Sequence, residues 1–350
     1  MAALLISCYQ PPPVVQSEAP PEVKGDIKLD ETAPFELGVS GAGGAKPELV
    51  TKEDIDEFNP SISPDGKTLL FNAVSFQQYY TTSRYFRGYY QGRRLYGTRR
   101  VWRRRMVDVT IAGVNANTGG QRTLYTRTGS RSWTPAWLPT GRSFLYASNQ
   151  PGSRSLVRSL SSSPNAAITV VVSGQVAPLA LKPDVSPDGK RVAFQTLIQG
   201  TWQVAISNMD GSRFTMLGRG RAPAWSPDGK TIAYTRIDNR RSHVFIANAD
   251  SGTNIVQVTS GPDDDFSPDW SPDGKRLVFA TNRGWSGAGG TAEKTRNLYI
   301  VKTDGSGLTQ LTTGRGKTYQ PCWGQDGWLY FSSNARGNHD IWRMRPPDAE

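Results

Sequence analysis

The sequence predicts an all-β fold, a six-bladed β-propeller of four-stranded blades, on the evidence of a repeat and its spacing. Residues 225–230 read Trp-Ser-Pro-Asp-Gly-Lys, and variants of this motif occur at five other places in the 350-residue chain. The glycines of successive copies are 75, 48, 40, 45 and 53 residues apart. A period of roughly 40 to 50 residues with strand-rich units is typical of β-propellers. The 36 glycines and 24 prolines also suit an all-β fold with many turns.

The motif has the chemistry of a tight turn. Its copies lie at 62–67, 137–142, 185–190, 225–230, 270–275 and 323–327. Pro presets φ at the second turn position, Asp tolerates the next position, and Gly takes the left-handed conformation that closes the turn. We therefore expect each copy to join a short first strand to a longer second strand, with the residue before the serine packed between neighbouring blades. An isolated surface turn would explain one copy but not six in phase.

The other strands follow in order within each repeat. The expected strands are 62–63, 68–73, 107–111 and 123–126 in blade one; 135–137, 143–146, 155–157 and 168–172 in blade two; 184–185, 192–196, 203–206 and 214–217 in blade three; 224–225, 232–235, 243–246 and 255–259 in blade four; 269–270, 277–281, 297–300 and 309–311 in blade five; and 322–323, 328–331 and 340–342 in blade six. Each is a short alternating or apolar run bounded by turn residues.

Blade six lacks a fourth strand in this series. Residues 49–51 read Leu-Val-Thr, which matches the Leu-Thr and Val-Thr endings at 311–312 and 258–259. We predict that this N-terminal strand completes blade six and closes the ring, because a closed ring leaves no free sheet edge.

The first 45 residues are expected to lie outside the propeller. Residues 5–8 read Leu-Ile-Ser-Cys, similar to the lipobox of bacterial lipoproteins, although the apolar part is short and lacks a basic start. Residues 9–45 are rich in Pro, Gly and Ala, as in a flexible tether. We expect residues 1–8 to be a truncated lipoprotein signal with Cys8 lipidated, which would place the protein in the bacterial periplasm at the outer membrane. A plain disordered tail is the alternative. No run of eighteen apolar residues is present, so we expect no transmembrane helix.

The net charge of +11 is concentrated in one insertion. Residues 75–106 hold nine arginines and no acidic residue, and they separate the second and third strands of blade one. Basic charge interleaved with aromatic rings is typical of nucleic-acid binders, and it would also suit another anionic polymer or lipid headgroups. A mobile solvated loop is the alternative. The expected anion-binding residues are Arg84, Arg87, Arg93, Arg94, Arg99, Arg100, Arg103, Arg104, Arg105, Tyr85, Tyr89 and Tyr90.

A second candidate site is the mouth of the channel, where loops from every blade converge. The residues that enter the inner strands are expected to ring this mouth: Glu57, Ser132, Lys182, Arg221, Asp265 and Thr318. Their mixed charge suits a peptide or protein loop better than a bare metal ion.

The sequence predicts no catalytic residues. Its two histidines, His243 and His339, each begin a third strand, where a polar rim residue is expected, and no triad can be assembled. The acidic run Asp263, Asp264 and Asp265, with Asp269, could bind calcium at the channel mouth. A solvated acidic loop is the preferred interpretation, so we expect no metal or other cofactor.

Over about residues 60–345 the unit resembles the WD40-like repeat of the TolB β-propeller family: Pro-x-Trp-Ser-Pro-Asp-Gly-Lys, an alternating strand, an Asn-Leu-Tyr-Ile strand, Asp-Gly and Leu-Thr. The family includes periplasmic scaffolds and non-catalytic domains of peptidases, and TolB docks a peptidoglycan-associated lipoprotein at its channel mouth. The preceding α/β domain of TolB has no counterpart here, and the insertion is not part of the family repeat.

The resemblance implies a monomeric, non-enzymatic interaction module that binds an envelope protein or peptide at the channel mouth. One alternative is a propeller hydrolase or lyase acting on carbohydrate or peptide. A second alternative is a binder of anionic polymer or nucleic acid through the insertion.

Overall fold

The structure is a computed structural model, and it describes residues 38–39, 46–52, 55–90, 93–126, 129, 131–149, 155–159, 168–173, 177–238, 240–283, 295–314 and 316–347. At 38–39, 87–90, 95, 99, 102 and 104 only the backbone is described. All regular elements in these ranges are β-strands apart from turns. None of these residues belongs to a helix that is long and apolar enough to cross a membrane.

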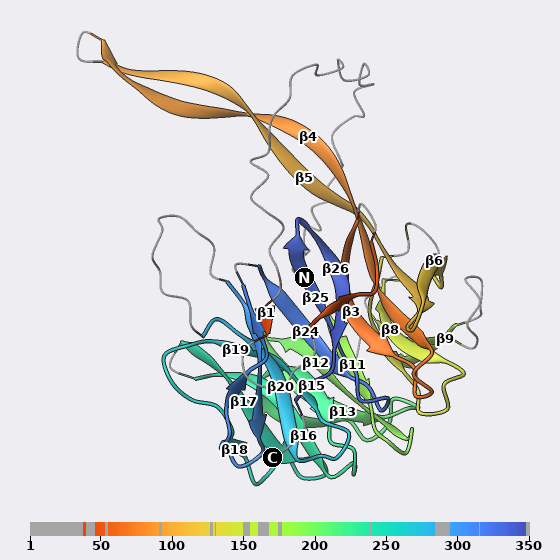
Figure 1. The fold of residues 1–350 in the computed structure, drawn as a ribbon. Helices are drawn as coiled ribbons and strands as arrows, with labels where there is room; N and C mark the ends of the chain where they lie inside the picture. The colour runs from red at the N-terminus through yellow and green to blue at the C-terminus, as the bar shows by residue number, and fades with distance from the viewer. Residues whose placement is uncertain are drawn as a thin grey trace, which may run out of the picture. The chain divides into compact units, whose positions relative to one another are not determined.

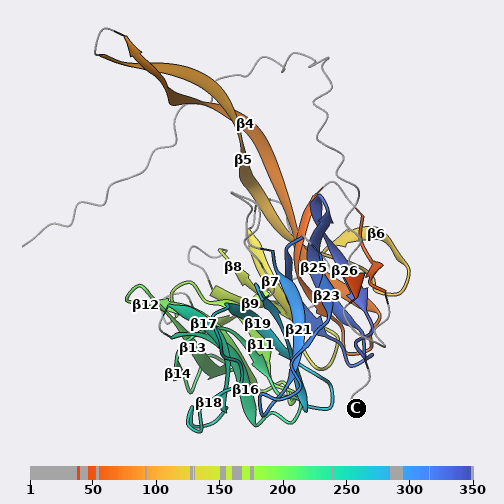
Figure 2. The same cartoon turned by 60° about the vertical axis from the view of Figure 1, so that its left-hand side comes forward.

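Six four-stranded antiparallel sheets form the blades (Figures 1 and 2). Blade one contains β3 (Asp56–Ile62), β4 (Thr68–Tyr90), β5 (Arg93–Asn115) and β6 (Gly119–Leu124). Blade two contains β7 (Ser132–Trp137), β8 (Phe144–Ser148), β9 (Ser155–Ser159) and β10 (Ile168–Val172). Blade three contains β11 (Leu181–Val185), β12 (Arg191–Ile198), β13 (Thr201–Asn208) and β14 (Thr215–Arg219).

The remaining blades repeat this order. Blade four contains β15 (Arg221–Trp225), β16 (Thr231–Asp238), β17 (Arg241–Asn248) and β18 (Val256–Gln257). Blade five contains β19 (Asp265–Trp270), β20 (Arg276–Thr281), β21 (Asn297–Lys302) and β22 (Thr309–Gln310). Blade six contains β24 (Thr318–Trp323), β25 (Leu329–Arg336), β26 (Asn338–Met344) and the N-terminal β2 (Glu48–Leu49). A further pair joins β1 (Gly38–Val39) to β23 (Thr312–Thr313).

The inner strand of each blade lies against the inner strand of the next, in the order β3, β7, β11, β15, β19, β24 and back to β3. The predicted six-bladed propeller is therefore confirmed, and its hydrophobic clusters lie between neighbouring blades.

The turn motif forms the hairpin tip that its chemistry predicts. The hydroxyl of Ser226 donates to Asp228 Oδ1 at 2.6 Å and accepts the backbone N–H of Thr231 at 2.9 Å. Gly229 has φ of 71°, in the left-handed region. The same serine bonds recur at 62–67, 185–190 and 270–275. The buried serine thus stabilises the turn, because its hydroxyl binds both the aspartate in the turn and the first N–H of the next strand.

A tryptophan at this motif position ties blades two, four and five to their predecessors. Trp225 is buried among residues of blades three and four, and its indole donates to the carbonyl of Asp184 in blade three at 3.1 Å. Trp137 and Trp270 make the same indole bond to Ser61 and Ala224 of their preceding blades, at 3.1 and 3.0 Å. The predicted packing between blades is confirmed, and the indole N–H adds a directional bond to it.

The ring closes through the N-terminal strand, as predicted. β2 pairs with β26, and Thr51 accepts the backbone N–H of Ile341 through its hydroxyl at 2.9 Å. Thr126, Thr259 and Thr312 accept the corresponding N–H groups in blades one, four and five at 2.8 to 2.9 Å. The Leu-Thr ending therefore has one structural role in several blades, and residues 49–51 supply it to blade six.

The insertion differs from its prediction. β4 and β5 pair from Thr68 with Asn115 out to Tyr90 with Arg93, interrupted only by bulges. The expected end of strand pattern near 75 and its return at 107 are therefore wrong. β3 pairs with β4 only as far as Val74, so the outer ribbon has two strands (Figure 1). Solvent on both faces of such a ribbon removes the apolar alternation by which a half-buried strand is recognised. We call residues 76–106 the arm.

The ring closure predicts matched effects for two threonines. Thr51→Val and Thr259→Val each leave a buried strand N–H without its hydroxyl acceptor, so each should lower the free energy of unfolding by about 1–3 kcal/mol. Thr51→Val should lose at least as much as Thr259→Val, because its hydroxyl also donates to the Glu57 carboxylate. Urea unfolding of the two variants measures this. A loss in Thr259→Val with wild-type stability in Thr51→Val would contradict closure by the N-terminal strand.

Candidate functional site

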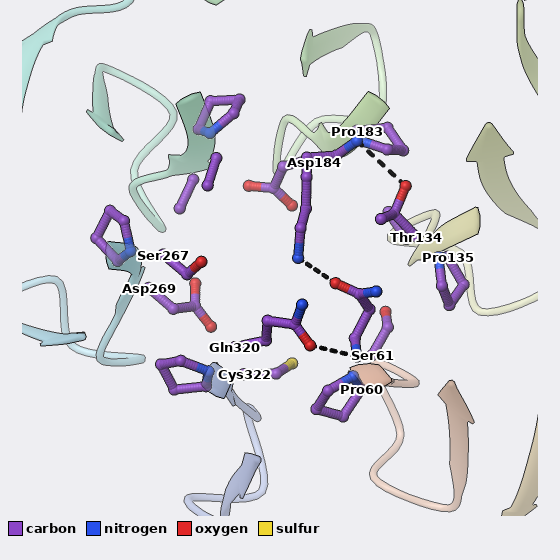
Figure 3. A pocket seen from close by; sticks show the side chains of 18 residues that line it. Pro60, Ser61, Thr134, Pro135, Pro183, Asp184, Ser267, Asp269, Gln320 and Cys322 are labelled. Atoms are coloured by element: carbon purple, nitrogen blue, oxygen red, sulfur yellow. Dashed lines mark hydrogen bonds between the residues drawn. The ribbon is translucent and has the colours of Figure 1, made fainter. Parts of the chain in front are cut away.

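The channel wall is built from one repeated backbone irregularity. In every inner strand the residue before a proline has positive φ, between 47° and 54°, and the pairing register shifts there. These residues line the channel: Asn59, Thr134, Lys182, Ala222, Ser267 and Gln320. Figure 3 shows Thr134, Ser267 and Gln320 around it. Proline has no N–H to donate and is tolerated at bulges and edge strands, which is the position of a strand beside the channel.

Side chains satisfy the backbone groups that these bulges release. The N–H of Thr134 donates to Asn72 Oδ1 at 2.8 Å, and the N–H of Ala222 donates to Gln195 Oε1 at 2.9 Å. The N–H of Asn59 donates to Gln320 Oε1 at 2.9 Å. A buried backbone donor without a partner is costly, so these amides hold the unusual backbone in place.

One lysine reaches across the channel. Lys182 Nζ donates to Asn59 Oδ1, which joins blade three to blade one. Burial lowers the pKa of Lys182 to about 8, because the channel disfavours the charged ammonium. This amine therefore loses its proton more readily than an exposed lysine, and an anionic group in the channel would raise its pKa again.

Two aspartates lie further along the same wall. Asp184 Oδ2 accepts the backbone N–H of Trp225 at 2.6 Å, and Asp269 Oδ2 accepts that of Trp323 at 2.6 Å. Burial raises the pKa of Asp184 to about 6; burial together with the Asp184 carboxylate raises the pKa of Asp269 to about 7. Burial and then the Asp269 carboxylate also raise the pKa of the Cys322 thiol, which keeps it protonated.

The channel opens at one end into a wider cavity of about 450 Å³. Its lining includes Lys182, Arg221, Ile237, Arg240, Phe266, Arg296 and Tyr319. The Arg296 guanidinium lies over the rings of Phe266 and Tyr319, 4.4 and 4.8 Å from their centroids. We call this cavity the mouth; its cations and aromatic rings give it a positive, partly apolar surface.

The structure brings only two of the six predicted mouth residues to the mouth. Lys182 and Arg221 line it. Glu57, Ser132, Asp265 and Thr318 are 0–1% exposed and lie inside the blades. The channel-lining residues lie one or two positions after most of the predicted ones, because the bulge adds a residue to each inner strand. We did not predict Phe266, Arg296 and Tyr319 from the sequence. The X-Pro pair that recurs in every inner strand could have located the bulge, and with it Phe266 and Tyr319.

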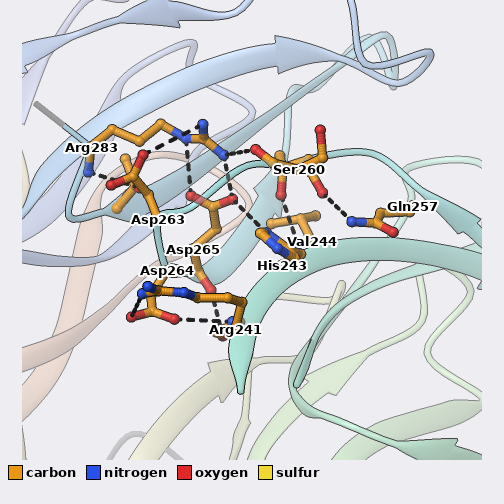
Figure 4. A network of polar contacts seen from close by, with 12 residues as sticks. Arg241, His243, Val244, Gln257, Ser260, Asp263, Asp264, Asp265 and Arg283 are labelled. Carbon is orange, nitrogen blue, oxygen red and sulfur yellow. Dashed lines mark hydrogen bonds and ion pairs between the residues drawn. The ribbon is translucent and has the colours of Figure 1, made fainter. Parts of the chain in front are cut away.

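The acidic run does not form a cation site. Arg283 pairs with Asp265 at 2.8 Å and with Asp263 at 4.0 Å, while Arg241 lies 3.7 Å from Asp264 (Figure 4). Asp269 stands apart on the channel wall, bonded to two tryptophan N–H groups. Within the described ranges no group of three potential ligands could hold a metal ion. The run is therefore a set of ion pairs between loops of neighbouring strands.

Both histidines contact an acidic residue. His243 is buried, with Nδ1 3.5 Å from Asp265 Oδ2, so it is not the exposed rim residue that was expected. His339 Nδ1 lies 3.4 Å from Asp56 Oδ1, beside the ring of Phe58. Neither residue lines the channel or the mouth.

The predicted anion-binding residues all belong to the arm. The exposed ones are Arg84, Arg93, Arg94, Arg100, Arg103, Arg105 and Tyr85. The side chains of Arg87, Arg99, Arg104, Tyr89 and Tyr90 lie outside the described part, as does Cys8.

Comparisons with known proteins agree with the fold. A family model for the TolB beta propeller domain matches residues 168–288 and 220–349. TolB from Acinetobacter baumannii is 14% identical, with 69% of this chain and 61% of that chain covered at a TM-score of 0.52. This chain therefore spans less than two thirds of that TolB. A search of curated proteins found no match.

Two solved enzymes share the fold at similar identity. Oligogalacturonate lyase from Vibrio parahaemolyticus is 14% identical, with 90% of this chain and 97% of that chain covered and a TM-score of 0.51. A gluconolactonase from Xanthomonas campestris is 14% identical, with 91% and 96% covered and a TM-score of 0.59. At this identity the likeness concerns the fold alone.

The channel carboxylates predict a pH dependence of stability. The pKa values of Asp184 and Asp269 are raised in the folded state, so above about pH 4 the unfolded chain releases protons that the folded chain keeps. The folded state is most favoured below the unfolded pKa, where both carboxyls are protonated in both states. This advantage is lost as the pH rises through the folded pKa values of about 6 and 7. Asp269→Asn should therefore lose less stability than wild type between pH 5 and pH 8 in urea unfolding.

Asp250→Asn is the control for this measurement, because Asp250 is an exposed carboxylate in a turn of blade four. An equal loss of stability in wild type, Asp269→Asn and Asp250→Asn would show that the channel carboxylates titrate normally.

Proposed function

Because the chain belongs to the TolB β-propeller domain family, we propose that it is a non-catalytic interaction module that binds a segment of another protein at the mouth. The observation that carries this proposal is the surface of the mouth, where cationic and aromatic side chains converge. Strands and turns of blades three to six contribute to it, so a single extended segment would contact several blades at once.

The charge of the mouth indicates the chemistry of the segment. Arg221 and Arg240 are exposed there, and the guanidinium of Arg296 is held by Phe266 and Tyr319. The only acidic residue among the described lining is Asp264, which has Arg241 beside it. A segment with carboxylate side chains and an aromatic residue would match this surface, because arginine pairs with carboxylates bidentately and stacks on rings.

The channel behind the mouth is suited to holding the blades together. Asp184 and Asp269 direct their carboxylates at tryptophan N–H groups of the next blade. The Cys322 thiol is kept protonated, and both histidines lie elsewhere. General acid–base catalysis needs groups that converge on a reacting atom, and these groups are engaged in structure.

A second candidate function is a hydrolase or lyase that acts on carbohydrate or peptide. The pKa values of about 6 and 7 for Asp184 and Asp269 are suited to proton transfer near neutral pH. Two proteins of the same fold are named as an oligogalacturonate lyase and a gluconolactonase.

Incubation of the full chain with oligogalacturonate and with gluconolactone between pH 5 and pH 8 tests the second candidate. We expect no turnover above the uncatalysed rate. Turnover that disappears in Asp184→Asn, while that variant stays folded, would replace the interaction module with an enzyme.

The location of the protein remains a prediction. With Cys8 lipidated, the protein would meet its partner in the periplasm; with residues 1–8 as a plain tail, it would meet protein and nucleic acid inside the cell. Residues 1–45, which carry this prediction, lie almost wholly outside the described part.

The mouth proposal predicts which peptides the full chain selects from a displayed random library. We expect enrichment of acidic peptides that carry an aromatic residue, because the mouth offers arginines and rings. Arg296→Ala should weaken a selected peptide by about 10-fold or more in fluorescence anisotropy, since a charged pair and a stacking contact are both lost. Arg296→Lys keeps the charge and should recover part of the affinity.

Arg213→Ala is the matched control for this experiment. Arg213 is exposed in the turn between β13 and β14, which lies at the end of the blade that bears the turn motif, away from the mouth. Enriched peptides that are neutral or basic, or that bind Arg296→Ala as well as wild type, would overturn the proposal.

A further inference from the structure

The arm is a two-stranded ribbon (Figure 2), and most of its described side chains are exposed. From Phe76 paired with Met106 outward, no third strand covers either edge within the described residues. At about 3.3 Å per residue the ribbon reaches roughly 50 Å from the blade. It is much longer than the hairpins that end at Gln199 and Arg240 in blades three and four. The propeller itself does not require this length.

The two strands of the arm carry different chemistry. Seven of the nine arginines lie on β5, between Arg93 and Arg105. β4 carries exposed aromatic rings at Tyr79, Tyr80, Tyr85 and Phe86, with exposed fractions of 40–53%. One edge of the ribbon is therefore mainly cationic and the other mainly aromatic.

The cations of the arm are all arginines. The rest of the chain has 12 lysines beside 20 arginines, whereas the arm has no lysine. A solvated loop that needed only positive charge would accept either residue. Arginine differs in offering a planar fork that binds phosphate bidentately and stacks on rings. The Arg100 guanidinium lies 4.8 Å from the Tyr80 ring centroid, across the ribbon.

The aromatic rings occupy both faces of the ribbon. Side chains alternate along a strand, so Tyr79 and Tyr85 lie on one face, while Tyr80 and Phe86 lie on the other. A flat membrane would reach one face or the tip alone. A flexible strand can pass along the edge and place planar groups on either face. The distribution therefore favours a linear polymer over a lipid surface.

The charge of the arm favours an anionic ligand. Nine arginines without an acidic residue repel one another, and a two-stranded ribbon is only marginally stable by itself in water. A polyanion bound along β5 would relieve the repulsion and stabilise the ribbon.

We propose that the arm binds single-stranded nucleic acid along its length, with the phosphates on the arginines of β5 and the bases stacked on the aromatic rings of β4. Every base has a π-face, so such binding has little dependence on sequence. A duplex hides its base faces and would leave the rings of β4 without a role. The proposal is independent of the mouth, which takes a different ligand.

The test is the fluorescence anisotropy of a labelled oligothymidylate of ~20 nucleotides with the full chain, between about 50 and 200 mM salt. The variant Arg100→Ala, Arg103→Ala and Arg105→Ala should weaken binding and reduce the slope of log affinity against log salt by about 2, since each phosphate contact contributes about 0.7. The pair Tyr79→Ala and Tyr85→Ala should weaken binding by roughly 5-fold or more per ring and leave the slope unchanged.

Two controls separate the arm from general charge and from misfolding. Arg131→Ala, Arg213→Ala and Arg219→Ala together remove the same charge from exposed sites outside the arm, and should bind like wild type. Arg100→Lys, Arg103→Lys and Arg105→Lys together should keep the salt slope and lose several-fold in affinity, since lysine cannot stack or bind bidentately.

Three results would overturn the proposal. One is affinity for the oligonucleotide that is unchanged in the tyrosine variant. Another is an equal loss in the control triple variant, which would make the binding non-specific charge. The third is tighter binding of an acidic polysaccharide such as polygalacturonate, or of acidic lipid vesicles, with sensitivity to the same arm substitutions.

Discussion

The contact on which the ring depends is the hydrogen-bonded junction between one inner strand and the tryptophan of the next blade. A four-stranded blade cannot bury both faces alone, so its stability comes from its neighbours. Trp225 fills the space between blades three and four, donates its indole to the Asp184 carbonyl and gives its backbone N–H to the Asp184 carboxylate. The junction combines apolar burial with two directional bonds, which fixes the position of blade four against blade three.

The same junction decides where function is located. The carboxylates that face the channel, Asp184 and Asp269, are bound to the N–H groups of neighbouring tryptophans. Proline bulges with positive φ line the wall, and side-chain amides hold them. The polar groups at the centre of the propeller thus bind its backbone and hold neighbouring blades together. The groups left for partners are at the mouth, where Arg221, Arg240 and Arg296 gather, and along the arm.

The sequence predicts the fold more fully than the site, for physical reasons. The turn motif acts within six residues, so its serine, aspartate and glycine roles follow from local chemistry. The closing strand is recognised because Thr51 repeats the role of Thr259. The mouth was misplaced because a bulge shifts the register, which buries Glu57 and Asp265 inside their blades. The arm was not recognised as strand, because a ribbon that is solvated on both faces has no apolar period.

The central claim is that a rigid propeller presents two separate surfaces that bind different kinds of molecule. Site-specific photo-cross-linking in the living source cells tests it most directly, with the photoreactive residue at Ile237 in the mouth or at Tyr85 on the arm. The account predicts that position 237 captures protein and position 85 captures nucleic acid. Capture of the same molecule from both positions would contradict it.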